Sequence, residues 1–213
     1  MTRNDTPDID WSLAETWYDD NADAFEMASL NMEPSPFLKE FAARLPAKAR
    51  VLDAGCGAGR DSCWLLGQKF QVGAFDISKE MVAAARDNTR HRVEPRWLDF
   101  RDYGDPPGSW DGIWALASLL HLPRAEVEEV LPRLIDSLTE DGVLAFAVKR
   151  GSGEKMDSRG RPMSFFELEE ILDLTRSVMP KGSKVEAYIS ECPDSSGTQT
   201  EWINITATRS RPF

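Results

Sequence analysis

Three alternate glycines after an acidic residue form the part of this sequence best suited to hold a ligand. An apolar stretch ends in Asp53. Glycine then occupies every second position, as Gly55, Gly57 and Gly59. Glycine adopts positive φ without steric cost, and its missing Cβ lets a ligand lie close to the backbone. The pattern is typical of a strand that turns sharply into a helix, whose N-terminus favours anionic groups.

A second acidic residue, Asp76, closes the next apolar run and follows Gly59 by 17 residues. At the end of a neighbouring strand its carboxylate can accept both hydroxyls of a ribose. The alternative is that Asp76 only caps the helix that begins near Ser78. The spacing Gly-x-Gly-x-Gly differs from the Gly-x-Gly-x-x-Gly of dinucleotide-binding loops. The two signals therefore favour a nucleoside cofactor and disfavour NAD.

The size and charge of the chain limit its class. Its 213 residues suit one domain with a proper core. The contents of 41% hydrophobic and 29% charged residues are ordinary for a globular protein. A net charge of −11 disfavours nonspecific binding to nucleic acid, which depends on Lys and Arg. We expect no nucleic-acid partner, and nothing in the sequence indicates an oligomeric state.

The N-terminus and the cysteines bear on the compartment. Residues Met1–Asp5 lead into acidic sequence without the apolar centre of a signal peptide. The longest apolar stretch, 113–122, is interrupted by polar residues and is too short to span a bilayer. Three cysteines without metal-ligand spacing argue against a disulfide framework and a metal site. We expect a cytoplasmic protein that makes no membrane contact.

Strands and helices alternate in the predicted elements. Strands are predicted at residues 50–54, 71–75, 93–98, 111–116 and 143–148, and helices at 11–30, 36–45, 60–68, 78–88, 124–138 and 165–178. Two closing strands, 184–191 and 201–208, flank a connector at 192–200. Short connections between the earlier elements imply a mostly parallel sheet with helices on both faces. The polar segment 149–163 is predicted as a long surface loop that could serve as a substrate lid.

These features resemble those of class I S-adenosylmethionine-dependent methyltransferases over roughly residues 36–209. The matching features are the glycine run, the acidic end of the second strand, and Asp99-Phe100 after the third strand. The segment Trp17-Tyr18-Asp19-x-x-Ala22-x-x-Phe25 is similar to the lid segment of small bacterial members. Residues 57–61, 118–123 and 202–204 resemble a branch loosely grouped with tellurite-resistance methyltransferases.

The resemblance implies an α/β fold. It is a Rossmann-like, doubly wound, seven-stranded and mostly parallel sheet with a C-terminal antiparallel hairpin and helices on both faces. Residues 1–213 would form a single methyltransferase domain, with an N-terminal helical lid segment at 1–46 and a Rossmann-like core at 47–213. The implied function is transfer of a methyl group from S-adenosyl-L-methionine to a small-molecule acceptor by in-line displacement. The alternative is a regulatory module that binds this cofactor and transfers nothing.

The resemblance also implies a set of cofactor-binding residues, carried over onto this sequence. They are Asp53, Gly55, Cys56, Gly57, Gly59, Arg60, Asp76, Ile77, Asp99, Phe100 and Ala115. Asp53 would orient the ammonium group of the methionine moiety, or would instead cap the backbone amides that follow it. Asp76 would bind the ribose, Ile77 and Phe100 would sandwich the adenine, and Asp99 would accept its amino group. Arg60 would bind the methionine carboxylate, or pair with Asp61 or Asp87.

Two residues are candidates for the chemistry of transfer. His121 follows the fourth strand, at the edge of the sheet where ligands bind in such folds, and is a candidate general base or a polar wall of the acceptor pocket. Tyr18 of the lid segment could lie near the sulfonium, where a π face stabilises positive charge. The alternative for each is a structural role in packing. Lys155, Arg159 and Arg161 of the predicted loop could meet an anionic acceptor.

Overall fold

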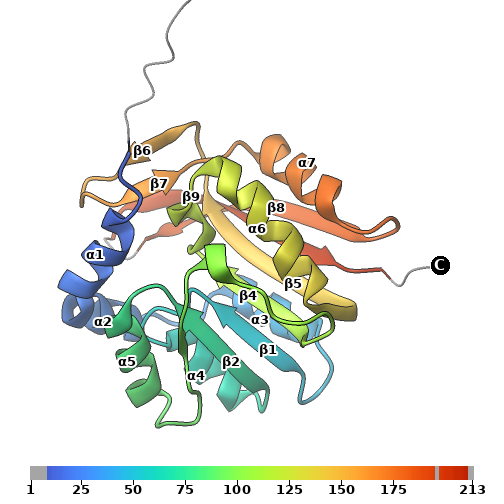
Figure 1. Cartoon of the computed structure of the whole chain (residues 1–213), viewed down its shortest axis with the longest axis horizontal. Helices are drawn as coiled ribbons and strands as arrows, with labels where there is room; N and C mark the ends of the chain where they lie inside the picture. The colour runs from blue at the N-terminus through green and yellow to red at the C-terminus, as the bar shows by residue number, and fades with distance from the viewer. Residues whose placement is uncertain (1–8, 195–196, 211–213) are drawn as a thin grey trace, which may run out of the picture.

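The computed structural model describes residues 9–194 and 197–210 and is built around a seven-stranded sheet (Figure 1). The strands lie in the order β3-β2-β1-β4-β5-β9-β8. Their bounds are β1 Arg50–Ala54, β2 Gln71–Asp76, β3 Arg96–Trp97, β4 Trp110–Leu116, β5 Leu138–Lys149, β8 Lys184–Pro193 and β9 Gln199–Thr208. Strand β9 runs antiparallel to β5 and β8, and the other neighbours pair in parallel. The predicted fold class is confirmed.

Strand β1 lies near the middle of the sheet, and its sequence explains why. Val51, Leu52 and Ala54 are fully buried, as expected of a strand in a parallel sheet covered on both faces. The strand pairs with β2 on one side and with β4 on the other. The strand order reverses at this point, and the crevice outside the carboxyl ends of β1 and β4 is where such folds bind ligands.

Helices cover both faces of the sheet. They are α1 Leu13–Asp20, α2 Ala22–Leu30, α3 Pro36–Ala43, α4 Arg60–Gly67, α5 Lys79–Asn88, α6 Arg124–Asp136 and α7 Leu168–Val178, with short 3₁₀ turns η1 Phe100–Asp102 and η2 Leu119–His121. In Figure 1, α6 and α7 lie in front of the sheet and α3 and α4 lie behind it. The Ser78 hydroxyl accepts the Met81 N–H at 3.1 Å, so the predicted N-cap of α5 is confirmed.

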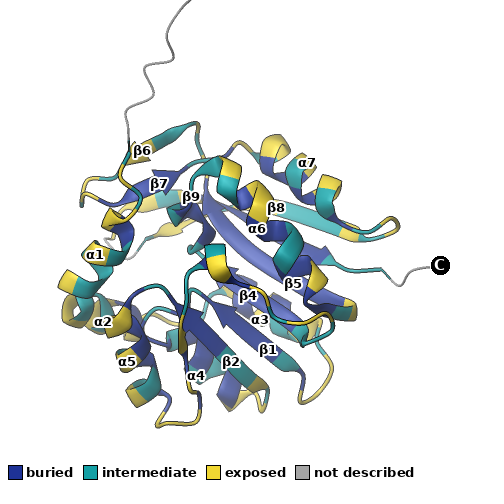
Figure 2. Ribbon diagram, in the orientation of Figure 1, coloured by how far each residue is buried: buried dark blue, intermediate teal, exposed yellow. Residues whose placement is uncertain are grey.

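The core lies between the sheet and its helices. Figure 2 shows that the central strands are buried along most of their length. Phe37 and Phe41 of α3 pack on Trp114 of β4, with ring centroids 5.0 Å and 5.4 Å from the indole. Gly112 of β4 leaves room for α3, since a Cβ there would lie 2.8 Å from the Phe41 ring. This packing fixes β4 and therefore the segment that follows it.

The N-terminal helix predicted at 11–30 is two helices. Asn21 separates α1 from α2, with φ −117° and ψ 21°. Both its side-chain amide and its backbone N–H donate to the Trp17 carbonyl, at 2.8 Å and 3.0 Å. An Asn side chain competes with the helical backbone in this way. The break therefore lets α1 and α2 take different directions at the carboxyl edge of the sheet.

The prediction of a long surface loop at 149–163 is wrong. Part of this segment forms the antiparallel strands β6 Glu154–Met156 and β7 Pro162–Ser164. Asp157 builds the turn between them, because its side chain accepts the backbone N–H groups of Arg159 and Arg161, each at 2.9 Å. Arg161 is only 3% exposed. The polar, glycine-rich composition resembles that of a loop. In the structure, however, the Asp157 carboxylate accepts the N–H groups of the turn, and the Arg161 side chain is buried.

Smaller differences concern element ends. The third strand is Arg96–Trp97, shorter than predicted, and the fifth is Leu138–Lys149, longer than predicted. Residues Met1–Asp5 and positions 195–196 of the predicted connector lie outside the described residues. Within residues 9–194 and 197–210, no helix combines the length and the apolar character needed to cross a bilayer.

Candidate functional site

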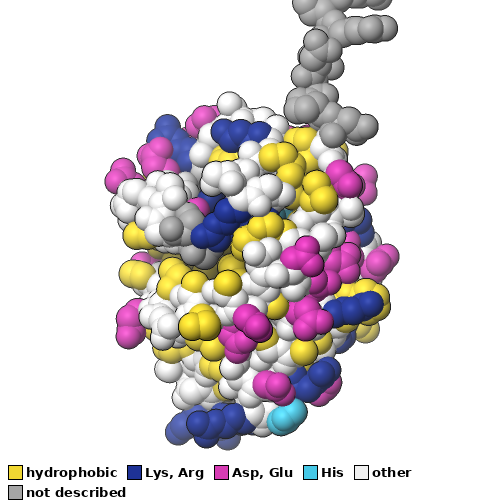
Figure 3. All heavy atoms as spheres, turned by 90° about the vertical axis from the view of Figure 1, so that its left-hand side faces the viewer, with side chains coloured by type: hydrophobic (Ala, Val, Ile, Leu, Met, Phe, Trp, Pro, Cys, Tyr) yellow, Lys and Arg dark blue, Asp and Glu magenta, His cyan; other side chains and the backbone are white. Residues whose placement is uncertain are grey.

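A cavity of about 460 Å³ lies at the carboxyl edge of the sheet. Its wall comes from the segments after β1, β2, β3 and β4, from α1 and α2, from the β6–β7 hairpin, and from the adjoining ends of β8 and β9. Most of the lining is apolar, and the volume is typical of a small-molecule site. Figure 3 views the molecule from the side of α1 and α2, where apolar side chains and some basic ones border a hollow.

The three predicted glycines all adopt positive φ, at +74° for Gly55, +51° for Gly57 and +81° for Gly59. A Cβ at Gly55 would lie 2.3 Å from the Ser118 Cβ, so a side chain there would clash with the segment after β4. A Cβ at Gly57 would point toward the Phe25 ring of α2, at 3.3 Å. The bend therefore needs glycine for its conformation and for the space beside the cavity.

Cys56 also lines the cavity between these glycines. Its backbone N–H donates to the Phe75 carbonyl at 3.0 Å, which ties the bend to the end of β2. Burial raises the pKa of the Cys56 thiol well above its usual range, and the nearby Asp76 adds to the shift. A thiol that stays protonated is a poor nucleophile. Cys56 thus supplies backbone and a small side chain.

Two predicted cofactor residues do not line the cavity. Gly59 packs against α5, where an added Cβ would lie 3.0 Å from the Ala85 backbone. Ala115 is fully buried within β4. The two residues that follow it, Leu116 and Ala117, line the cavity instead. The structure therefore gives Gly59 and Ala115 a packing role, because the strand reaches the cavity only after Ala115.

Asp76 lines the cavity and holds the bend. One carboxylate oxygen accepts the Gly57 N–H at 2.8 Å, and the other accepts the Ser78 N–H at 3.0 Å. Asp76 is 8% exposed. Burial raises its pKa to about 6, against the hydrogen bonds from these backbone amides. The two roles raised for Asp76 coexist, since it caps the turn before α5 and also faces the cavity.

Asp53 is a buried carboxylate at the base of the cavity. The Ser62 hydroxyl donates to it at 2.6 Å. Burial, together with the neighbouring charge of Asp61, raises the pKa of Asp53 to about 7, while the Ser62 hydrogen bond lowers it. This hydrogen bond ties Asp53 to α4, and not to the backbone amides that follow it.

Arg60 pairs with Asp61, one of the alternatives raised above. Its Nε and Nη2 atoms donate to the two carboxylate oxygens at 2.7 Å and 3.0 Å. The Trp114 indole N–H also donates to Asp61, at 2.8 Å. Asp61 is 6% exposed, so it is a fixed partner. The pairing holds the guanidinium in place beside the cavity, which Arg60 lines.

Ile77, Asp99 and Phe100 all line the cavity. The Phe100 ring is 8% exposed and lies edge-on to Phe75, with centroids 4.9 Å apart. Asp99 accepts the backbone N–H of Arg101 at 2.8 Å and its guanidinium at 2.7 Å. This part of the cavity combines apolar surface with a carboxylate, which suits a flat base bearing an amino group.

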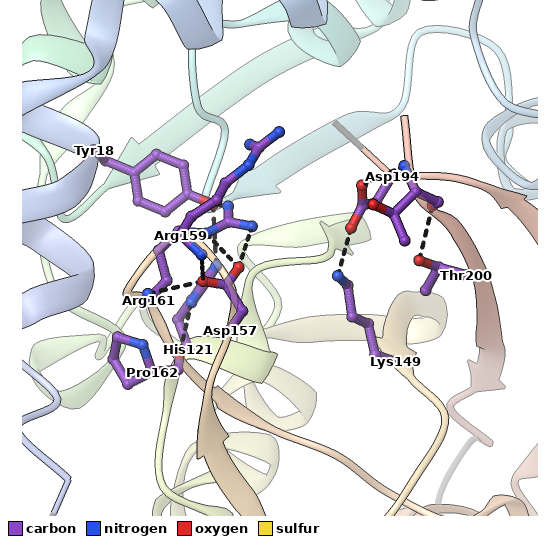
Figure 4. A network of polar contacts seen from close by, with 10 residues as sticks. Tyr18, His121, Lys149, Asp157, Arg159, Arg161, Pro162, Asp194 and Thr200 are labelled. Atoms are coloured by element: carbon purple, nitrogen blue, oxygen red, sulfur yellow. Dashed lines mark hydrogen bonds and ion pairs between the residues drawn. The ribbon is translucent and has the colours of Figure 1, made fainter. Parts of the chain in front are cut away.

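A polar network joins Tyr18, His121 and Arg161, all of which line the cavity (Figure 4). The His121 Nδ1 lies 3.0 Å from the Pro162 carbonyl, which can only accept, so Nδ1 carries the proton. His121 Nε2 therefore accepts from the Tyr18 hydroxyl, at 3.0 Å. The Tyr18 oxygen in turn accepts from Arg161 Nη1 at 2.9 Å. Every one of these donors and acceptors is matched.

The surroundings keep both Tyr18 and His121 uncharged. Burial lowers the pKa of His121 to about 4, and the positive charge of Arg161 adds to this shift. Burial raises the pKa of Tyr18, although Arg161 opposes that shift. At neutral pH the network therefore holds a neutral imidazole and a neutral phenol, with Arg161 charged.

Lys149 and Trp202 are two of the lining residues that sequence reasoning missed. Lys149 Nζ donates to Asp194 at 2.6 Å and lies 5.6 Å from the centre of the Trp202 ring. The signal was available, because the predicted segments place both residues at the carboxyl edge of the sheet. Among the described residues, no three His, Cys, Asp or Glu side chains are grouped to hold a metal ion.

Residues 51–142 match a family model described as a methyltransferase domain. Methyltransferase GfsG of Streptomyces halstedii is 34% identical over 113 residues, which cover 48% of this chain and 39% of that protein. A ubiquinone biosynthesis O-methyltransferase of Xanthomonas axonopodis pv. citri is 34% identical over 118 residues, covering 53% of this chain and 48% of that protein. The matches thus span less than half the length of these relatives.

A solved structure with a similar fold is the 1,6-didemethyltoxoflavin-N1-methyltransferase of Burkholderia thailandensis. That crystal structure holds 1,6-didemethyltoxoflavin and S-adenosylhomocysteine. The TM-score is 0.71 at 21% identity, with 94% of this chain and 86% of that chain covered. The likeness therefore extends over most of the chain, and it concerns the fold.

Proposed function

We propose that this chain is a class I S-adenosylmethionine-dependent methyltransferase, because residues 51–142 match a methyltransferase-domain model, and that it methylates a small-molecule acceptor by in-line displacement. One observation carries the proposal. The glycine bend, Asp76, Tyr18 and His121 all line one cavity. A cofactor held at the bend would then present its methyl group toward the lid helix α1.

The residues present fit S-adenosylmethionine. Gly55 and Gly57 line the cavity, and without a Cβ they let a ligand lie close to the backbone. Each Asp76 oxygen accepts one backbone N–H and can accept a further hydrogen bond. In this proposal those further bonds come from the ribose hydroxyls. Asp53 faces the ammonium group, and Arg60 faces the carboxylate of the methionine moiety.

The adenine would lie beside the segments that follow β2 and β3. Ile77 and Phe100 present apolar surface on the cavity wall, and Asp99 presents carboxylate oxygens. A carboxylate is the natural acceptor for an exocyclic amino group. Gly59 supports this arrangement indirectly, because it lets α4 pack closely on α5.

The chemistry asks little of the chain beyond positioning. Bound S-adenosylmethionine supplies an electrophilic methyl group on a good leaving group. The cavity walls place the acceptor in line and keep water away. The aromatic ring of Tyr18 and the buried carboxylates Asp53 and Asp76 favour positive charge nearby. Covalent catalysis is not required, and Cys56 stays a protonated thiol.

Tyr18 and His121 are the candidates for proton transfer when an acceptor arrives protonated. The acceptor gives its proton to the Tyr18 oxygen while the Tyr18 proton moves to His121 Nε2. Arg161 stabilises negative charge on the oxygen during this step, from 2.9 Å. The low pKa of His121, about 4, makes it a weak base. The relay therefore suits acceptors that lose their proton readily.

A small-molecule acceptor fits the size of the cavity, about 460 Å³, since part of it must hold the cofactor. The ubiquinone biosynthesis O-methyltransferase and the 1,6-didemethyltoxoflavin-N1-methyltransferase bear names of small-molecule pathways and substrates, which supports the same class here. We propose no nucleic-acid partner, because the net charge is −11. A cytoplasmic location remains part of the proposal.

Formation of S-adenosylhomocysteine tests the proposal. Purified protein is incubated with S-adenosylmethionine and fractionated small-molecule extract, and the product is measured by mass spectrometry. Product that depends on both protein and extract supports transfer. Tight binding of S-adenosylhomocysteine without turnover on any fraction favours the regulatory module instead. No feature of the described residues favours that alternative, because the predicted cradle is intact.

A further inference from the structure

Arg161 reaches the lid helix from the short hairpin β6–β7. We propose that Arg161 is a positioning residue, which holds α1 closed over the cofactor through the hydroxyl of Tyr18. The inference rests on the proposed function for the identity of the ligand. It gives the β6–β7 hairpin, which lies after β5 in the chain, a part in forming the site.

The contacts of Arg161 converge on α1. Its Nη1 donates to the Tyr18 oxygen at 2.9 Å. Its guanidinium carbon lies 4.7 Å from the centre of the Trp17 ring and 5.6 Å from that of Tyr18. The side chain is 4% exposed. A buried cation over two aromatic rings, with a hydrogen bond to one of them, is a strong attachment between two segments.

The hairpin holds Arg161 in place before it meets the lid. Arg161 Nε and Nη2 both donate to Asp157, at 3.0 Å and 2.8 Å. Asp157 also accepts the backbone N–H groups of the same turn. The guanidinium thus uses one edge to bind its own hairpin and has Nη1 left for Tyr18. Lysine cannot reproduce this, because a single ammonium cannot span both partners in the fixed fork of arginine.

The Tyr18 hydroxyl is the point where three segments meet (Figure 4). It comes from α1, accepts from Arg161 of the hairpin, and donates to His121 of η2. The Tyr18 ring also lies edge-on to Phe25 of α2, with centroids 5.1 Å apart. Phe25 faces the bend at Gly57. Losing the Arg161 contact would therefore loosen the aromatic cover of the cofactor cradle.

A second attachment holds the end of α1. Asp19 accepts the Ser78 hydroxyl at 2.6 Å and the Glu80 N–H at 3.3 Å. This contact lies on α5, next to Asp76, and so can keep the helix folded when the Arg161 contact is removed. Asp19 thus joins α1 to the N-terminus of α5, and Arg161 joins α1 to the β6–β7 hairpin.

The rate at which S-adenosylhomocysteine leaves the protein tests this role. Dissociation is followed by stopped-flow tryptophan fluorescence in the full chain and in Arg161→Lys, Tyr18→Phe and the double variant. We expect each single variant to release the ligand faster by roughly tenfold or more, as for loss of a charge-assisted hydrogen bond. The double variant should be little faster than either one, because both changes remove the same contact. Lys155→Met is the matched control on the same hairpin, since Lys155 lies over Phe165 and not on the cavity wall.

Several outcomes would overturn the role. One is a folded Arg161→Lys variant that releases S-adenosylhomocysteine at the same rate as the unchanged protein. Another is a double variant in which the two single-variant increases in release rate multiply fully. If Arg161→Lys fails to fold, Tyr18→Phe alone decides, since it leaves the bonds between Arg161 and Asp157 intact. An unchanged release rate in Tyr18→Phe then contradicts the proposal.

Hydrogen exchange without ligand separates this inference from the proposed function. The amides of α1 should exchange faster in Arg161→Lys than in the unchanged protein, while those of α4 should not change. Failure of the unchanged protein to bind S-adenosylhomocysteine would defeat the proposed function, and the exchange result would still test the contact between Arg161 and Tyr18. Equal exchange of α1 in both proteins would defeat that contact as a hold on the lid.

Discussion

Asp76 accepts the backbone N–H of Gly57 at 2.8 Å, and this bond ties the end of β2 to the glycine bend after β1. The carboxylate is buried, and its other oxygen accepts the Ser78 N–H. The glycine bend and the proposed ribose acceptor are thus a single unit. A change at either residue should affect the other, which makes this part of the cavity the best place to test the account.

Gly55→Ala should damage the bend more than an ordinary glycine substitution. The residue has φ +74°, and an added Cβ would lie 2.3 Å from the Ser118 Cβ. We expect a loss of unfolding free energy above about 1 kcal/mol, because both strain and a clash contribute, together with weaker binding of S-adenosylhomocysteine. Urea unfolding and calorimetry measure the two effects. Gly104→Ala is the control, since nothing lies within 4 Å of a Cβ there; equal behaviour of the two variants would contradict the assignment.

Ligand affinity should depend on pH through Asp53. Its pKa is raised to about 7, so the carboxylate gains a proton as pH falls through neutrality. An ionised Asp53 attracts the ammonium group of the ligand and a protonated one does not. Affinity for S-adenosylhomocysteine should therefore fall below pH 7, by at most about tenfold per pH unit. Asp76, with a pKa of about 6, acts in the same direction at lower pH.

The Asp53→Asn variant isolates this effect. Its affinity should be lower than that of the unchanged protein at pH 8, and it should vary less between pH 8 and pH 6. Calorimetry across this range measures both. A pH dependence that is the same in Asp53→Asn and in the unchanged protein would show that Asp53 does not face the ammonium group.

The imidazole of His121 should stay neutral in the folded protein until well below pH 6. The pKa of His121 is lowered to about 4 by burial and by Arg161. Because the folded-state pKa lies below the ordinary value of about 6.5, the contribution of His121 to stability is present above that value and is lost as pH falls toward 4. Asp53 and Asp76 have raised pKa values and act in the opposite direction, so the residue itself must be observed.

Proton NMR observes it directly. The chain has two histidines, and His91→Gln removes the other one, whose side chain is 70% exposed. The remaining ring resonance should not shift between pH 8 and pH 6. A titration midpoint near the ordinary histidine value would mean that the ring is not held between Tyr18 and Pro162 as described.

The sequence predicted the alternating core well because each element there has its own local signal. Strand β1 has the predicted bounds Arg50–Ala54, since an apolar run ends at glycine. Asp76, Ile77, Asp99 and Phe100 reach the cavity because parallel strands end at one edge. The prediction chose Ala115, which lies inside β4, whereas the next two residues, Leu116 and Ala117, line the cavity.

The sequence could not predict contacts that depend on segments far apart in the chain. The residues between 149 and 163 have the composition of a loop, and only the fold shows that Arg161 is buried against Tyr18. The break at Asn21 was also missed, because an apolar helical pattern continues through it. The pairing of Lys149 with Asp194 likewise needs the register of β5, β9 and β8.

Calorimetric titration with S-adenosylhomocysteine tests the central claim most directly. The unchanged protein should bind one equivalent with a dissociation constant on the order of micromolar. A folded Asp76→Ala variant should bind at least about tenfold more weakly, because the ribose loses a charged acceptor and the bend loses its tie. An unchanged protein that binds no S-adenosylhomocysteine, or an Asp76→Ala variant that binds it equally well, would contradict the account.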